Sequence, residues 1–170
     1  SSVRPSSMAP PGGSSTAAMN RRGTRLYINE DNAVQVILAS DGRNIKSIKT
    51  GIAADFVEMS PSYRHIVAVG DDEAVVIDER RGRVMERIDG VSSIAPAFSE
   101  RGDELYLAKG HLIVQRSGRR FDREKTIDLG ETVTGVTSGD EGNVIATGDE
   151  HIYLIDGDTL EIIDRLKARS

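Results

Sequence analysis

Two short runs decide the fold of this chain, IVAVG at residues 66–70 and AVVID at residues 74–78, with the acidic turn DDE at residues 71–73 between them. Both runs are rich in Val and are bounded by Gly or Asp, which is typical of β-strands rather than of helices. The pair therefore predicts a β-hairpin.

The same pair of runs recurs on both sides of this hairpin. It is seen as LYIN (26–29) with AVQVI (33–37), LYLAKG (105–110) with HLIVQ (111–115), and VIATG (144–148) with HIYLID (151–156). A weaker run precedes each pair: TAAMN (16–20), DFVEMS (55–60), IAPAFS (94–99) and TGVTS (134–138). Another follows each pair: NIKSI (44–48), VMERI (84–88), EKTIDL (124–129) and LEIIDRL (160–166). Each unit thus predicts four strands.

Equivalent positions recur with one period. The column Ile48, Ile88, Ile127 and Leu166 is spaced by 40, 39 and 39 residues, and the serines Ser60, Ser99 and Ser138 are 39 apart. The units are 14–53, 54–92, 93–131 and 132–170. Four strands in about 40 residues is the pattern of a β-propeller blade. A leucine-rich repeat is shorter, and helical repeats need a helical periodicity that is missing here. The fold class is therefore all-β, as four propeller blades or half of a larger propeller.

The units resemble the YVTN-type propeller repeat. The resemblance rests on GTRLYI–NAVQVI–SDGRNI, YRHIVAV–EAVVID–RRGRV and NVIATG–HIYLID–DTLEI, and it covers nearly all of residues 14–170. The usual Pro-Asp-Gly is missing except as Ser-Pro-Ser at 60–62, and the Gly-His and Trp-Asp signatures of WD40 repeats are absent. The resemblance implies a WD40-like fold and no particular reaction, because propellers carry many unrelated functions.

Composition excludes several classes of protein. The 170 residues contain no cysteine, so a disulfide framework, a cysteine-ligated zinc and a cysteine nucleophile are all excluded. No apolar run reaches the roughly 18 residues of a membrane helix, and we expect no membrane insertion. Residues 1–13, SSVRPSSMAPPGG, have almost nothing to bury and are expected to be a disordered tail or linker.

Charged turns suggest a partner surface. The turns between the third and fourth strands of units 2 and 3 are rich in arginine, and our predicted partner-binding residues are Arg80, Arg81, Arg83, Arg119 and Arg120. Arginine forms bidentate pairs with carboxylates and phosphates. We do not expect nucleic-acid binding, because the body of the chain is acidic and few aromatic side chains are available for stacking.

The sequence contains no complete catalytic or cofactor motif. No phosphate loop, Rossmann glycine pattern or HExxH is present, so we expect no cofactor. The serine column recurs in three units, which favours hydrogen bonding into the following turn over nucleophilic catalysis. Weak candidates for metal ligands lie in the acidic turns, although their spacing matches no known metal-binding loop: Asp71, Asp72, Asp149 and His151.

Two functions therefore stay open. The first is a non-catalytic protein-interaction scaffold that presents charged faces. The second is a propeller-type enzyme or a metal- or ligand-binding protein with a carboxylate site at the central channel, for which the first strands offer Asn20, Asp55, Glu58, Glu131 and Thr134. Four units could close alone, pair with a second chain or belong to a longer protein. We favour self-association or a partner, because unclosed end blades expose strand edges and apolar faces.

Overall fold

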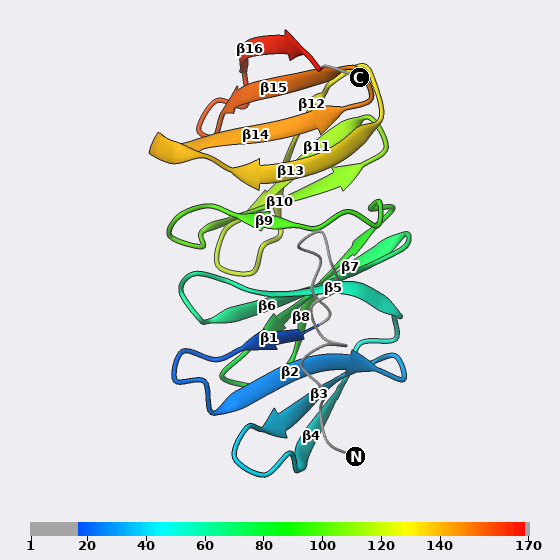
Figure 1. Ribbon diagram of the computed structural model, residues 1–170, viewed down its shortest axis with the longest axis vertical. Helices are drawn as coiled ribbons and strands as arrows, with labels where there is room; N and C mark the ends of the chain where they lie inside the picture. The colour runs from blue at the N-terminus through cyan, green and yellow to red at the C-terminus, as the bar shows by residue number, and fades with distance from the viewer. Residues whose placement is uncertain (1–16, 169–170) are drawn as a thin grey trace. The chain divides into compact units, whose positions relative to one another are not determined.

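The computed structural model describes residues 17–168, and the expected tail at 1–13 lies outside them. The described chain is all-β, with four antiparallel sheets of four strands each, and its only helical segment is a short 3-10 turn, Asp140–Gly142 (Figure 1). This confirms the predicted fold class of four propeller blades. Within the described residues, no helix has the length and apolar character needed to cross a membrane.

Each blade uses four strands that are consecutive in the chain. Blade 1 is β1 (Ala17–Met19), β2 (Arg25–Glu30), β3 (Ala33–Leu38) and β4 (Asn44–Lys49). Blade 2 is β5 (Ala54–Met59), β6 (His65–Gly70), β7 (Glu73–Asp78) and β8 (Arg83–Asp89). Blade 3 is β9 (Ala97–Phe98), β10 (Glu104–Lys109), β11 (Leu112–Ser117) and β12 (Arg123–Asp128). Blade 4 is β13 (Val133–Ser138), β14 (Asn143–Gly148), β15 (His151–Asp156) and β16 (Ile162–Lys167).

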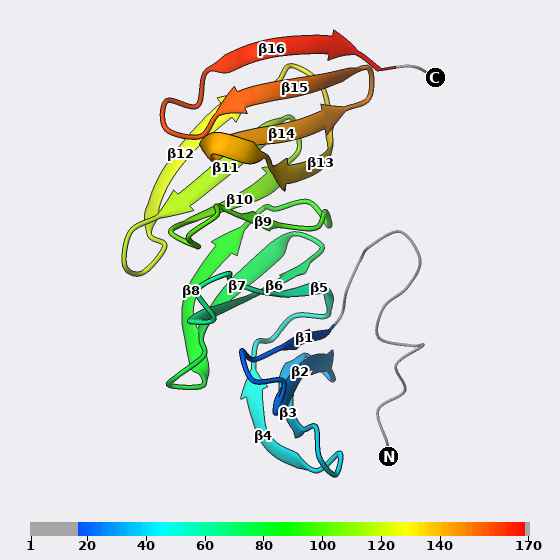
Figure 2. The ribbon, with the colours of Figure 1, turned by 60° about the vertical axis from the view of Figure 1, so that its left-hand side comes forward.

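Neighbouring strands of a blade are neighbours in sequence, so each sheet is a meander (Figure 2). The C-terminal run that contains Leu166 forms strand β16 and pairs with β15, as the repeat predicts. The first strand is the weakest of each set in blades 1 and 3, where β1 has three residues and β9 only two. Pro96 immediately precedes β9 and has no N–H to donate to a ladder, which explains the shortness of that strand.

The turns of a blade gather at two ends. In blade 2 the β6–β7 turn meets the connection to the next blade, because Asp72 N donates to Val91 O at 2.9 Å and Gly90 N donates to Asp72 O at 2.7 Å. At the other end Glu79 N donates to Arg64 O at 3.0 Å, which joins the β7–β8 turn to the β5–β6 turn. Charges on one kind of turn therefore share one end of the blade.

The chain divides into two compact units, Ser1–Ser93 with blades 1 and 2, and Ile94–Ser170 with blades 3 and 4. Each unit has its own apolar core between its two blades. The largest buried side chains include Tyr27 and Ile77 in the first unit, and Tyr106, Tyr153 and Ile155 in the second. The charged turns lie at the ends of the blades that pack around these two cores.

Two of the three serines of the column, Ser60 and Ser99, have the structural role that their recurrence predicts. Ser60 Oγ accepts from His65 N at 3.1 Å, and Ser99 Oγ accepts from Glu104 N at 2.9 Å, across the turn between the first two strands. In blade 1, Asn20 takes this position and its Oδ1 accepts from the N–H groups of residues 24 and 25 at 2.9 and 3.0 Å. These three groups stabilise turns, whereas Ser138 Oγ donates to Phe98 O of the preceding blade.

Candidate functional site

The β7–β8 turn presents the first group of predicted arginines. Arg80, Arg81 and Arg83 are all exposed. Arg81 lies 3.7 Å from an Asp78 carboxylate oxygen, and its backbone N–H donates to the other oxygen of Asp78 at 3.1 Å. Among the described residues, no carboxylate pairs with the side chains of Arg80 or Arg83. The turn therefore holds guanidinium groups that are in solvent and free to meet an anion.

The β11–β12 turn presents the second group. Arg119 and Arg120 are exposed, and in the part of the chain that the structure describes neither has a carboxylate partner. Nearby Arg116 is engaged, because its Nε lies 2.9 Å from Glu124 and its Nη1 donates to Phe121 O at 3.0 Å. This second group lies in the second compact unit and the first group in the first unit, so each is a separate small basic surface.

The acidic turns hold the weak candidates for metal ligands. Asp71 and Asp72 lie on the β6–β7 turn of the first unit, whereas Asp149 and His151 lie at the β14–β15 turn of the second. Over residues 17–168, no group of three His, Asp or Glu side chains is placed to hold a metal ion. His151 instead pairs with a carboxylate that the spacing in the sequence did not predict.

That carboxylate is Glu131, in the connection between blades 3 and 4. Its Oε2 lies 2.7 Å from His151 Nδ1 and also accepts from the Tyr153 hydroxyl. Its Oε1 accepts from the backbone N–H of Glu150 at 2.5 Å. Because a carboxylate can only accept, His151 carries its proton on Nδ1 when this contact is a hydrogen bond. The hydrogen bond from Tyr153, then that from Glu150 N, lower the pKa of Glu131 to about 2.

The Glu131 cluster ties the blade connection to the β14–β15 turn. Both oxygens of Glu131 are occupied by donors from the same blade, so the group is an ionised anchor rather than an acid or base poised for a substrate. Tyr153 is 2% exposed, and its single hydroxyl proton is shared between Glu131 Oε2 and Leu129 O, the latter at 3.2 Å, which ties the connection after β12 to β15.

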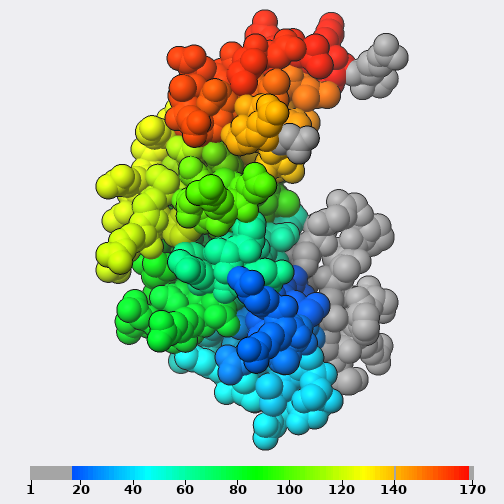
Figure 3. All heavy atoms as spheres, turned by 90° about the vertical axis from the view of Figure 1, so that its left-hand side faces the viewer, coloured from blue at the N-terminus to red at the C-terminus, as the bar shows by residue number. Residues whose placement is uncertain are grey.

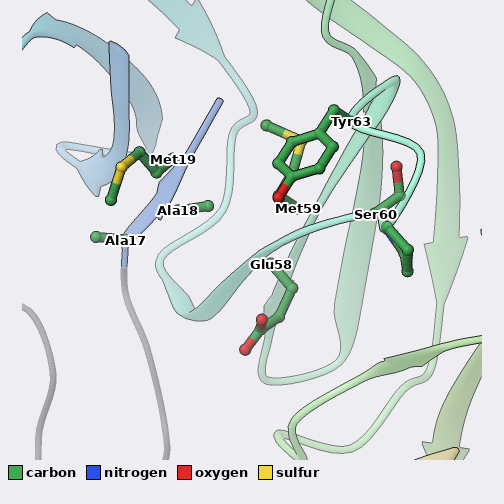
Figure 4. Close-up of a pocket in the computed structure, with 8 residues that line it drawn as sticks. Ala17, Ala18, Met19, Glu58, Met59, Ser60 and Tyr63 are labelled. Carbon is green, nitrogen blue, oxygen red and sulfur yellow. The ribbon is translucent and has the colours of Figure 1, made fainter. Parts of the chain in front are cut away.

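A pocket of about 290 Å³ lies in the first unit, lined by β1, β5 and the turn after β5 (Figure 4). Met19 lies on one side and Met59 and Tyr63 on the other, and the carboxylate of Glu58 points away from the methionines. Burial raises the pKa of Glu58. The Arg21 guanidinium lies 5.0 Å from the ring centre of Tyr63. Of the first-strand residues predicted for a carboxylate site, this pocket contains only Glu58.

The other first-strand candidates are separate from the pocket. Asp55 accepts a hydrogen bond from Ser93, Asn20 caps its own turn, and Thr134 bonds to Thr147 at 2.9 Å. Within the first unit, Asn20 and Asp55 therefore do not join Glu58 in its pocket. Sequence reasoning did not find the Glu131–His151–Tyr153 cluster, although register could have, because β13, β14 and β15 are neighbours in one sheet.

Comparisons with known proteins identify the class of fold. No protein-family model and no curated protein sequence matches it. Among solved structures it is similar to Kuenenia stuttgartiensis hydrazine synthase, with a TM-score of 0.75 and 16% identity over 90% of this chain. It is also similar to the β-propeller domain of Myceliophteria thermophila Cps50 (Swd1), with a TM-score of 0.75 and 13% identity over 95% of this chain. The four sheets are therefore those of a β-propeller.

Both similar structures are longer than this chain. The matches cover 48% of the hydrazine synthase chain and 57% of the Cps50 domain chain, so this chain spans about half the length of each. At these identities the likeness shows the fold alone, and the YVTN subtype stays a prediction.

Proposed function

We propose that this chain is a non-catalytic protein-interaction scaffold, a β-propeller segment that is completed by self-association or by a partner and that presents charged turns to a protein. The observation that carries the proposal is the β7–β8 turn, where Arg80 and Arg83 are exposed and lack a carboxylate partner among the described residues. Surface ion pairs contribute little to folding stability, so arginines gathered on one turn are better explained by binding than by stability.

The expected partner is an acidic protein segment. Arginine offers a planar set of donors that matches a carboxylate, and several guanidinium groups on one turn add geometric selectivity. Such binding weakens as salt screens the charges, over a Debye length of about 8 Å at physiological ionic strength.

Charge reversal tests this proposal. The tagged 170-residue chain and its Arg80→Glu/Arg83→Glu variant are used to capture partners from an extract of the source cells, at low and high salt. We expect the variant to lose a partner that the unchanged chain retains at low salt. The matched control is Lys109→Glu/Lys125→Glu, which makes the same change of charge at exposed residues away from this turn. Identical partners for all three chains would refute the proposal.

The pocket beside Glu58 favours a second candidate function, the binding of a small cationic ligand. Glu58 contributes a half-buried carboxylate to one side of the pocket, and thioether and phenol groups line the other sides, which suits a cation that also has apolar surface. Tetramethylammonium is the first probe. We expect it to raise the melting temperature of the unchanged chain and not that of Glu58→Gln. An equal shift in both chains, or none in either, would exclude this function.

A further inference from the structure

The two compact units join their blades in the same way, which defines two faces of a blade. We call the face that meets the following blade the forward face, and the face that meets the preceding blade the rear face. In the first unit the forward face of blade 1 carries Tyr27, Val34, Val36 and Ile48, and the rear face of blade 2 carries Ile66, Ala68, Val75 and Ile77. In the second unit the forward face of blade 3 carries Tyr106, Ala108, Ile113 and Ile127, and the rear face of blade 4 carries Val144, Ala146, Tyr153 and Ile155.

Blade 4 has a forward face of the same kind. Strand alternation and register place Ile145, Ile152, Leu154 and Leu166 on one side of the sheet, at the repeat positions of Tyr27, Val34, Val36 and Ile48. Leu166 is 59% exposed and Ile152 is 38% exposed, whereas Ile48 and Val34 are 4% and 0% exposed. Figure 3 shows the atoms of β16, in red, at the surface of the second unit. The forward face of blade 4 is therefore apolar and exposed, whereas the equivalent face of blade 1 is buried.

Blade 1 has the matching rear face. It carries Leu26, Ile28 and Ile37 at the repeat positions of Ile66, Ala68 and Ile77, and Met19 pairs with Leu26 on the same side. Met19 is 50% exposed, and Leu26 and Ile28 are half-buried. The chain therefore carries one forward face and one rear face of the kinds that already join blades within it.

We propose that the forward face of blade 4 binds the rear face of blade 1 in a second copy of this chain. Each copy offers both faces, so a two-fold axis relates two identical contacts in a dimer. This inference rests on the part of the proposed function in which the propeller is completed by association, and it is independent of the arginine turns.

Polar contacts within the two units support the pairing of these faces. Tyr27 on the forward face of blade 1 donates to Glu79 of blade 2 at 2.7 Å. At the same repeat position in blade 3, Tyr106 bonds to Gln115, which donates to Gly157 O of blade 4 at 2.8 Å. Each internal contact therefore joins a polar side chain on the forward face to an acceptor at one fixed position of the next blade.

The forward face of blade 4 lacks the first member of this polar pair, and the rear side of blade 1 lacks the second. Blade 4 has Ile145 where blades 1 and 3 have Tyr27 and Tyr106 and blade 2 has Val67, and blade 1 has Ala39 where blade 2 has Glu79. The backbone confirms the equivalence, because Ala39 N donates to Thr24 O just as Glu79 N donates to Arg64 O. A lone Tyr or a lone Glu here would be buried unpaired on docking, whereas Ile145 and Ala39 leave no unsatisfied group.

Cross-linking between two single-cysteine variants tests the proposal. The chain has no native cysteine, so Ile145→Cys and Ala39→Cys each introduce one thiol. We use a short bismaleimide, because a disulfide needs Cα atoms within about 7 Å. Tyr27→Cys/Glu79→Cys in one chain calibrates the reagent, since those side chains already touch. The two variants are co-expressed, and each is also treated alone.

We expect a covalent dimer from the mixture of Ile145→Cys and Ala39→Cys and none from either alone. No product in the mixture, equal product in all three samples, or an internal cross-link in the Ile145→Cys/Ala39→Cys chain would overturn the pairing. A heteromer with another protein would also overturn it and would leave the proposed scaffold function standing. Arg80→Glu/Arg83→Glu chains should cross-link normally, so a failure of partner capture is distinguishable from a failure of this pairing.

Discussion

One repeat column gives a quantitative prediction, because Ile48 and Leu166 have the same position in blades 1 and 4 and very different exposure, 4% against 59%. We change each residue to Ala. Removing a buried Ile leaves a cavity and typically costs about 2–5 kcal/mol of unfolding free energy. Leu166 has about two fifths of its surface buried, and full burial of a Leu contributes roughly 1.5–3 kcal/mol, so Leu166→Ala should cost only about 1 kcal/mol in the isolated chain.

The assay is urea unfolding, followed by circular dichroism at a low and a high protein concentration. If Leu166 lies in a contact between copies, the unchanged chain becomes more stable as its concentration rises, and Leu166→Ala removes much of this gain. Ile48→Ala lowers the midpoint equally at both concentrations. A cost for Leu166→Ala as large as that for Ile48→Ala at low concentration would refute the reasoning, as would a midpoint of the unchanged chain that is independent of concentration.

Three further predictions concern single contacts. The pKa of Glu131 is about 2, below its ordinary value of 4.5. The stability that ionised Glu131 gives the folded chain is therefore complete above about pH 4.5 and is lost as the pH falls through 2. Glu131→Gln should make the thermal unfolding temperature less dependent on pH in this acid range. Tyr27→Phe removes a hydrogen bond to Glu79 and should cost about 1–2 kcal/mol in urea unfolding. Gly157→Ala would place a Cβ 2.1 Å from Gly142 O and should cost about 1–3 kcal/mol, measured in the same way.

Controls separate these effects from general damage. Gly139→Ala is the match for Gly157→Ala, because a Cβ there would first meet a side-chain atom at 3.4 Å. Equal losses in these two variants would contradict the steric argument. For Glu131, an unchanged acid dependence in Glu131→Gln would show that other carboxylates dominate. For Tyr27, burial and the bond to Glu79 raise the pKa, and burial also raises the pKa of Tyr106 and of Tyr153, so the number of tyrosines that titrate late should fall by one in Tyr27→Phe.

The sequence predicted the blades because their signal is local and repeated. Val- and Ile-rich runs between glycine and acidic turns give strands, and columns of equivalent residues with one period give four meanders. The serine column also predicted turn hydrogen bonds, which Ser60 and Ser99 make. Asn20 was missed in that role because its residue type differs, although it has the same repeat position.

Which side chains are exposed, and which pair with one another, could not be predicted from the repeat. Ile48 and Leu166 belong to one column, and only the packing of a following blade distinguishes them. Glu131 and His151 are 20 residues apart, and they meet because the connection between blades returns to the same end as the β14–β15 turn. Arg80 and Arg83 are exposed on their turn, but whether a partner binds them does not follow from a repeat.

The native mass of the chain in solution tests the central claim most directly, that two copies complete one propeller through their open end faces. Analytical ultracentrifugation of the 170-residue chain should give twice 18.4 kDa at high concentration. Leu166→Glu should give 18.4 kDa under the same conditions, and Lys167→Glu, which points to the other side of β16, should still give the dimer. A mass of 18.4 kDa for the unchanged chain at every concentration, or a dimer that survives Leu166→Glu, would contradict the account.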